Sequence, residues 1–155
     1  MRQQDITCVE NVDERRNMEA VSLLSMLGAC SYEDIKSRRI GVILVLGFGI
    51  LGIFLHLFYS RLSIEEMLGG IAIGLIMFLV SYLSQERIGK GDALVLTVSG
   101  IYLGFWNNLF LLWGASLMAS FVGIVFIAKG ERKRELPFVP FLLVVYVLGL
   151  ILKPE

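Results

Sequence analysis

Long stretches without a charged side chain constrain the fold of this sequence more than any motif does. Residues 40–59 and 67–84 each have the length, roughly 17 to 25 residues, that a helix needs to span a bilayer. The stretch from Ala93 to Ala128 is too long for one span and predicts two, with a break near the polar and aromatic residues 106–108. Residues 136–152 predict a last span. Residues 20–32 form a shorter apolar stretch, which we interpret as a first helix.

Together these segments predict an all-α, polytopic integral membrane protein with about six transmembrane helices. The composition agrees, because the mean hydropathy is +0.75 and 56% of the residues are hydrophobic. We expect a flexible polar N-terminal tail over residues 1–17 and one helical membrane domain over residues 18–155. The 14 basic and 14 acidic residues balance, so net charge gives no reason to expect a nucleic-acid partner.

Cysteine usage argues against a metal centre. Cys8 and Cys30 are too few and too far apart for a zinc cluster or a disulfide framework. We therefore expect no metal and no cofactor.

Charged residues gather in the polar junctions between the predicted spans. Two predicted spans separate the junction at residues 31–39 from that at 84–92, and two more lead to residues 129–135, so all three junctions are expected to face one side of the membrane. Nine basic residues then share that side: Lys36, Arg38, Arg39, Arg87, Lys90, Lys129, Arg132, Lys133 and Arg134. The positive-inside rule makes this side cytoplasmic. Arg15 and Arg16 go against the rule if residues 20–32 span.

Two aspartates, Asp34 and Asp92, each lie within a few residues of an apolar segment on the predicted cytoplasmic side. Carboxylates at membrane depth are costly to keep charged, so they usually face a protein interior or a water-filled cavity and serve a function. Two facing carboxyl groups can share one proton and activate a water, as aspartic proteases do, without a metal or a covalent intermediate. We interpret Asp34 and Asp92 as such a catalytic pair.

A plainer interpretation remains open for each residue alone. Asp34 could be a solvated acid paired with Lys36 or Arg38, and Asp92 could cap the helix that begins at Ala93. Gly89 and Gly91 flank Lys90 just before Asp92, and without Cβ atoms they allow unusual backbone angles and close approach of an extended peptide.

Three segments carry a resemblance to a known family. The sequence GKGD (residues 89–92) fits the GxGD motif of membrane aspartyl proteases, and SYEDIKSRRI (31–40) is similar to the aspartate-then-basic segment of type IV prepilin peptidases. The sequence ELPFVPFLL (135–143) resembles the segment that opens the last helix of that family. Order and spacing agree over residues 20–152.

This resemblance implies a membrane aspartyl endopeptidase that removes the leader of prepilin-like proteins. Asp34 and Asp92 would be the catalytic pair, and the residues that shape the site or bind substrate would be Gly89, Lys90, Gly91, Pro137, Phe138 and Pro140. The enzyme would be a multi-pass protein of the inner (plasma) membrane with its active site on the cytoplasmic side. Its partners would be a prepilin-like substrate and membrane lipid.

The chain departs from the family pattern at several positions. Gly41 and Val42 stand where a proline and an asparagine are common, and Leu94 stands where a lysine is common. The chain also lacks the cytoplasmic insertion, with its zinc-binding cysteines, of the larger members that methylate the new amino terminus. The resemblance is therefore to the short form, and it implies cleavage without methylation.

The glycine pairs Gly70/Gly74 and Gly100/Gly104 predict close helix packing in lipid, with a face between two copies of the chain as the alternative. Two function classes stay open. The first is the aspartyl endopeptidase. The second is a non-enzymatic helical component of a secretion or pilus system, or a small transporter whose acids carry protons. Acids at the ends of spans favour the protease, because a transporter is expected to place them near the membrane midplane.

Overall fold

Five helices make up the described part of the chain. A computed structural model describes residues 2–37, 40–59, 62–83, 89–129 and 137–152, without the side chains of 2–16 and 59. The helices are α1 (Arg2–Ser37), α2 (Val42–Tyr59), α3 (Ile64–Leu83), α4 (Lys90–Ala128) and α5 (Val139–Leu152). The described residues contain no strand, so the predicted all-α class is confirmed for them.

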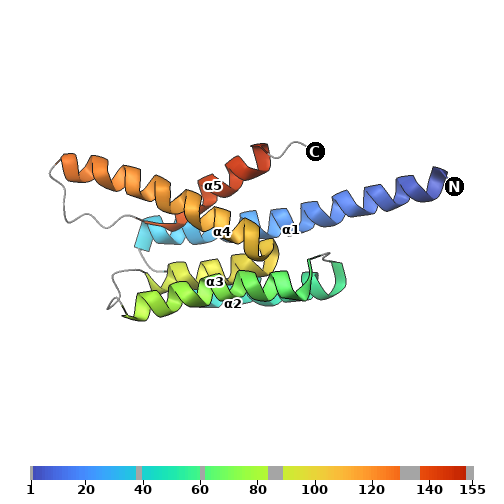
Figure 1. Cartoon of the computed structure of the whole chain (residues 1–155), viewed down its shortest axis with the longest axis horizontal. Helices are drawn as coiled ribbons and strands as arrows, with labels where there is room; N and C mark the ends of the chain where they lie inside the picture. The colour runs from blue at the N-terminus through green and yellow to red at the C-terminus, as the bar shows by residue number, and fades with distance from the viewer. Residues whose placement is uncertain (1, 38–39, 60–61, 84–88, 130–136, 153–155) are drawn as a thin grey trace.

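The helix ends fall into two groups (Figure 1). At one end of the molecule α1 ends, α2 begins, α3 ends, α4 begins and ends, and α5 begins; at the other, α2 ends and α3 begins. We call the first the junction end and the second the opposite end. The three polar junctions of the sequence therefore connect helix ends on one side. The predicted basic residues Arg38, Arg39, Arg87, Arg132, Lys133 and Arg134 lie outside the described residues.

Helix α4 folds back on itself at Gly104. This residue has φ 70° and ψ −172°, a backbone conformation in which glycine avoids the clash that a Cβ would cause. A first limb (residues 90–103) runs from the junction end beside α3, and a second limb (105–128) returns toward that end (Figure 1). The prediction of a break in this stretch is confirmed, but the break lies at Gly104 rather than at residues 106–108.

Asn108 shows why the polar residues 106–108 do not mark the turn of α4. Its side chain is fully buried, and its amide nitrogen donates to the carbonyl oxygens of Gly70 and Leu96, each at 3.0 Å. Its amide oxygen accepts a hydrogen bond from the buried Ser99 hydroxyl at 2.7 Å. The residue therefore ties the second limb to the first limb and to α3, instead of facing the headgroups.

Glycines bring α3 and the first limb of α4 together. A Cβ at Gly70 would overlap the backbone of Gly100, and a Cβ at Gly74 would overlap Thr97. Backbone contact of this kind is what small residues four apart allow between membrane helices. The packing role predicted for Gly70, Gly74 and Gly100 is confirmed, whereas Gly104 forms the turn.

Large apolar side chains point outward over much of the surface. Ile43 of α2 is 88% exposed, for example, and Phe110 of α4 is 71% exposed. Helices α3 and α4 are long and apolar enough to cross a membrane, while α2 and α5 are apolar but shorter. A membrane protein is therefore indicated, and the count of about six spans stays a prediction.

Helix α1 differs from the expected N-terminal tail. It continues without a break from Arg2 to Ser37, so the polar residues before the first apolar segment are helical. Its N-terminal part extends beyond the other helices (Figure 1). The division into a tail (1–17) and a membrane domain (18–155) remains a prediction.

Candidate active site

Asp34 lies near the end of α1 and is only 8% exposed. Its Oδ2 accepts a hydrogen bond from the backbone N–H of Val139, the first residue of α5, at 3.2 Å. The first N–H groups of a helix have no partner within the helix, so a carboxylate there is stabilised by both the bond and the helix dipole. Asp34 is thus a buried acid held by a distant helix, not the solvated acid that the plainer interpretation offered.

Asp92 lies in the first turn of α4 and is partly buried. The N-cap residue of α4 is Gly89, which has no side chain to make a capping hydrogen bond. The N–H groups of Asp92 and Ala93 donate instead to the carbonyl oxygen of Gly89, at 3.1 and 3.4 Å. Asp92 is therefore inside the helix, and its carboxylate does not serve as the N-cap.

The two carboxyl groups lie close enough to influence each other, although they are far apart in sequence. Asp34 follows the uncharged segment of α1, and Asp92 precedes that of α4. Burial raises the pKa of Asp92, and the neighbouring charge of Asp34 raises it further. Burial also raises the pKa of Asp34, against the opposing effect of the Val139 and Phe138 amides. Burial and the charge of Asp34 therefore favour the protonated form of Asp92.

The glycines of the GKGD segment make room for these contacts. A Cβ at Gly89 would lie 2.8 Å from Oδ2 of Asp92, and one at Gly91 would lie 2.8 Å from Cδ1 of Ile40. Neither glycine has an unusual backbone conformation, because Gly89 has φ −60° and ψ 124° and Gly91 is helical. The expected reason for these glycines was wrong on this point: they provide space rather than a special φ.

The other predicted site residues lie at the same end. Lys90 is exposed at the start of α4. Pro137 and Phe138 directly precede α5, and Pro140 is its second residue, a position where proline costs no helical hydrogen bond. Phe138 packs against the core, and its carbonyl oxygen accepts the Phe141 N–H at 3.0 Å. These residues fix where α5 begins and so where its free amides meet Asp34.

Glu33 and Ile40 were missed in the sequence. Glu33 Oε2 accepts a hydrogen bond from the Gly41 N–H at 2.7 Å, which ties the end of α1 to the start of α2. Gly41, which stands where the family commonly has a proline, is the sequence signal for the bond to Glu33, because a proline would have no N–H to donate.

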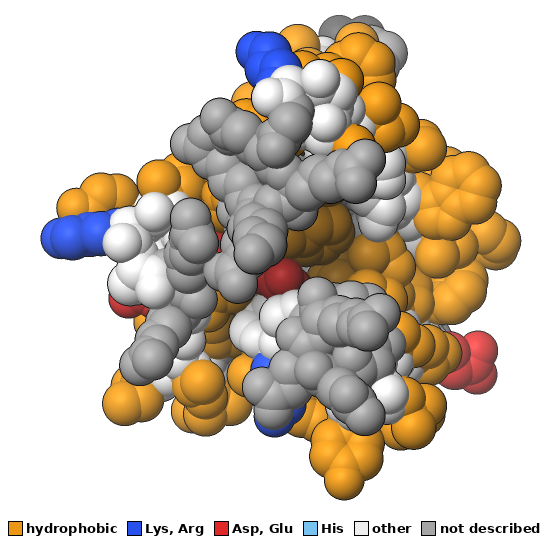
Figure 2. Space-filling model, turned by 90° about the vertical axis from the view of Figure 1, so that its left-hand side faces the viewer, with side chains coloured by type: hydrophobic (Ala, Val, Ile, Leu, Met, Phe, Trp, Pro, Cys, Tyr) orange, Lys and Arg blue, Asp and Glu red, His pale blue; other side chains and the backbone are white. Residues whose placement is uncertain are grey.

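Charged side chains are visible at the junction end. Figure 2 shows this end, with an acidic group near the centre of the view, other acidic groups toward its left and right edges, and Lys or Arg side chains at the top, at the left and below the centre. Glu33, Asp34 and Asp92 all belong to this end of the described chain. Within the described residues, no group of three or more His, Cys, Asp or Glu side chains is placed to hold a metal ion.

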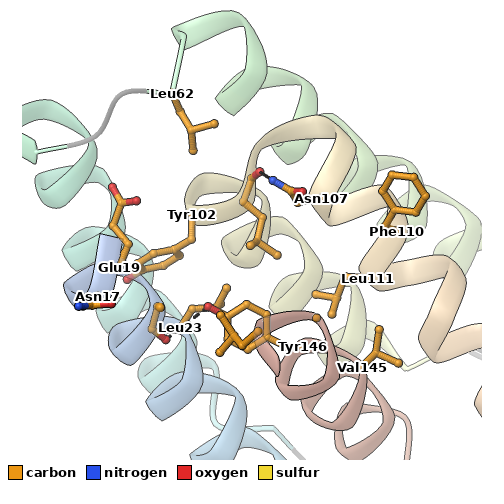
Figure 3. Close-up of a pocket in the computed structure, with 14 residues that line it drawn as sticks. Asn17, Glu19, Leu23, Leu62, Tyr102, Asn107, Phe110, Leu111, Val145 and Tyr146 are labelled. Atoms are coloured by element: carbon orange, nitrogen blue, oxygen red, sulfur yellow. Dashed lines mark hydrogen bonds between the residues drawn. The ribbon is translucent and has the colours of Figure 1, made fainter. Parts of the chain in front are cut away.

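A pocket of about 620 Å³ lies toward the opposite end, between α1, α4 and α5 (Figure 3). Apolar residues such as Leu23, Leu111 and Val145 form much of its wall. Two tyrosine hydroxyls there are already engaged, because Tyr102 donates to the Phe48 carbonyl at 2.7 Å and Tyr146 to that of Ala20 at 3.4 Å. Neither Asp34 nor Asp92 is among the residues that line this pocket.

Comparison with known proteins gives one match. The model of the type IV leader peptidase family matches residues 21–128. This range includes Asp34, Asp92 and the GKGD segment, and it ends before Pro137, Phe138 and Pro140. No curated protein and no solved structure matches the chain.

Proposed function

Because the chain belongs to the type IV leader peptidase family, we propose that it is a membrane aspartyl endopeptidase that cleaves the leader from prepilin-like precursors. Asp34 and Asp92 are its catalytic residues in this proposal. The observation that supports it is that Asp34 and Asp92, from separate helices, lie at the same end and near enough for the charge of Asp34 to raise the pKa of Asp92.

The surroundings of the two acids suggest a division of roles. The Val139 amide stabilises the charged form of Asp34, so Asp34 accepts a proton from the attacking water. Asp92, whose raised pKa favours the protonated form, donates its proton to the carbonyl oxygen of the scissile peptide. The water oxygen bonds to the carbonyl carbon and gives a neutral gem-diol. On collapse, the C–N bond breaks, Asp34 returns a proton to the leaving nitrogen, and Asp92 recovers its proton from a hydroxyl group.

The family and the topology support a proposed substrate and a proposed membrane side. The junction end holds both acids and the helix ends that border the basic junctions, so we assign it to the cytoplasmic face of the inner membrane. A prepilin-like substrate would present its leader there while its apolar segment stays in the lipid. Gly89, Lys90 and Gly91, with Pro137, Phe138 and Pro140, would border the bound leader. We further propose cleavage without methylation.

The test is the processing of a prepilin co-expressed with the protein. Asp34→Asn and Asp92→Asn should each lower the cleavage rate about 10²- to 10⁴-fold, the range for losing a general acid or base. A matched control is Glu65→Gln, which makes the same change at an exposed residue of α3 at the opposite end. The shift of precursor to mature pilin on a gel measures the rate. Processing at the wild-type rate by either aspartate variant would exclude the catalytic pair.

A further inference from the structure

A chain of contacts connects the two helices that carry the candidate catalytic acids. It starts at Glu33, the residue before Asp34, and ends at Gly91, the residue before Asp92. Gly41 and Ile40, which lie ahead of α2, form the middle of this chain. The acids are thus joined through the start of a third helix.

The first contact is the hydrogen bond between Glu33 and Gly41. At 2.7 Å it has the length of a charge-assisted bond, which is stronger than a bond between neutral groups. The fit is close, since a Cβ at Gly41 would lie 2.8 Å from Glu33 Oε2 and 3.2 Å from Oε1. The side chain of Glu33 therefore points to the backbone of residue 41 and fixes its position relative to α1.

The second contact is between Ile40 and Gly91. A Cβ at Gly91 would lie 3.0 Å from the Cβ of Ile40 and 3.1 Å from its Cγ1, so the Ile40 side chain lies directly on the backbone of α4. Ile40 also packs against the hydrophobic core. Because residue 41 is held by Glu33, the neighbouring Ile40 is held over Gly91, and the first turn of α4 is held relative to α1.

We propose that Glu33 is a positioning residue: its bond to Gly41 keeps Ile40 on Gly91 and thereby sets the separation of Asp34 and Asp92. The effect of Glu33 on catalysis rests on the proposed function, whereas its effect on the position of Ile40 does not. Glu33 need not touch the substrate or the reacting atoms for this role. A glutamine at residue 33 retains an oxygen that can accept the bond, whereas alanine does not.

The first experiment measures the geometry without using peptidase activity. Ile40→Cys and Gly91→Cys are combined in a chain whose Cys8 and Cys30 are changed to alanine, and disulfide formation in membranes is followed under mild oxidation. A Cβ added at Gly91 would lie 3.0 Å from the Cβ of Ile40, and a disulfide needs about 3.5–4.5 Å between the two Cβ atoms, so a small relaxation allows the disulfide. Glu33→Ala should slow its formation about tenfold or more, the effect of losing one hydrogen bond to a charged group.

Two results would overturn the proposal: an unchanged rate in Glu33→Ala, or an equal loss in Glu33→Gln. Glu65→Ala is the control for removing an exposed glutamate, and it should leave the rate unchanged. Thermal unfolding of each variant in detergent shows whether the variant folds. If Glu33→Ala does not fold, the comparison of Glu33→Gln with Glu33→Leu decides, since the proposal requires that only leucine slow the cross-link.

The second experiment uses prepilin cleavage by the chain with its native residues 40 and 91. Glu33→Ala should lower kcat with little change in KM, and Glu33→Gln should restore most of kcat, because displaced acids impair the chemical step rather than binding. Equal kcat in Glu33→Ala and wild type would overturn the catalytic part. If no prepilin is cleaved even by the wild type, the proposed function fails, while the cross-linking result still decides the positioning role.

Discussion

At the scale of single residues, the first glycine of the GKGD segment, Gly89, leaves room for the side chain of Asp92. Its missing side chain is the volume that the Asp92 carboxylate occupies. We expect Gly89→Ala to push that carboxylate away and to lower kcat for prepilin cleavage about tenfold to hundredfold, as small misplacements of catalytic groups do. Because Gly89 is exposed, the melting temperature should change little.

Gly47→Ala is the matched control for this prediction. Gly47 lies on α2, is exposed, and has open space where a Cβ would go. Alanine there should leave kcat unchanged and stabilise the helix by up to about 1 kcal/mol. Full activity of Gly89→Ala would contradict the prediction, because it would mean that the added Cβ does not displace the Asp92 carboxylate from its working position.

The proposed roles of the two acids predict a bell-shaped pH profile of kcat/KM. The active form has a charged Asp34 and a protonated Asp92, so activity falls at low pH when Asp34 is protonated as well. It falls again as the pH rises through the pKa of Asp92, and because burial and the charge of Asp34 raise that pKa to about 7, this loss should come well above the usual range of a carboxyl group. A profile that stays flat across this range would contradict these roles.

At the scale of helices, the return of α4 depends on one buried amide. Asn108 bonds to α3 and to the first limb, so Asn108→Leu removes three hydrogen bonds and leaves the Gly70 carbonyl without its side-chain partner. We expect a loss of about 1–3 kcal/mol in the free energy of unfolding. Denaturation in mixed micelles measures this quantity.

The adjacent residue offers the control for that variant. Asn107 is exposed, and its side chain donates to the Leu103 carbonyl at 3.1 Å, a local bond across the turn at Gly104 that stays near solvent. Asn107→Leu should therefore cost less than Asn108→Leu. Equal losses would mean that the buried bonds do not hold the two limbs together.

At the scale of the whole molecule, the two groups of helix ends predict a definite membrane topology. Ser37 and Lys129 lie at the junction end, and Ser63 lies at the opposite end. Single cysteines at these positions, in a chain with Cys8 and Cys30 changed to alanine, should report it. A membrane-impermeant thiol reagent added outside the cell should label Ser63→Cys, but not Ser37→Cys or Lys129→Cys. Labelling of all three from outside would contradict the cytoplasmic junction end.

The sequence predicted most of the helices and the end of the molecule at which both acids lie, for reasons that are local. Uncharged stretches mark α2, α3 and α5, and the parity of spans places Asp34 and Asp92 at the same end. The contacts that hold them were not predictable in this way. Whether Asn108 is solvated or buried, and whether Glu33 faces solvent or Gly41, depends on packing between segments that are distant or separated by a turn. A pattern of hydrophobic residues does not predict such hydrogen bonds.

The bond from Val139 to Asp34 joins an early helix to the last described one. A ribosome makes α1 first, so Asp34 is synthesised before the Val139 amide that will hold it. While the chain is still growing, the carboxylate has no such donor, and the two acids cannot adopt their final arrangement. In the proposed peptidase, cleavage would therefore begin only after α5 has joined the other helices.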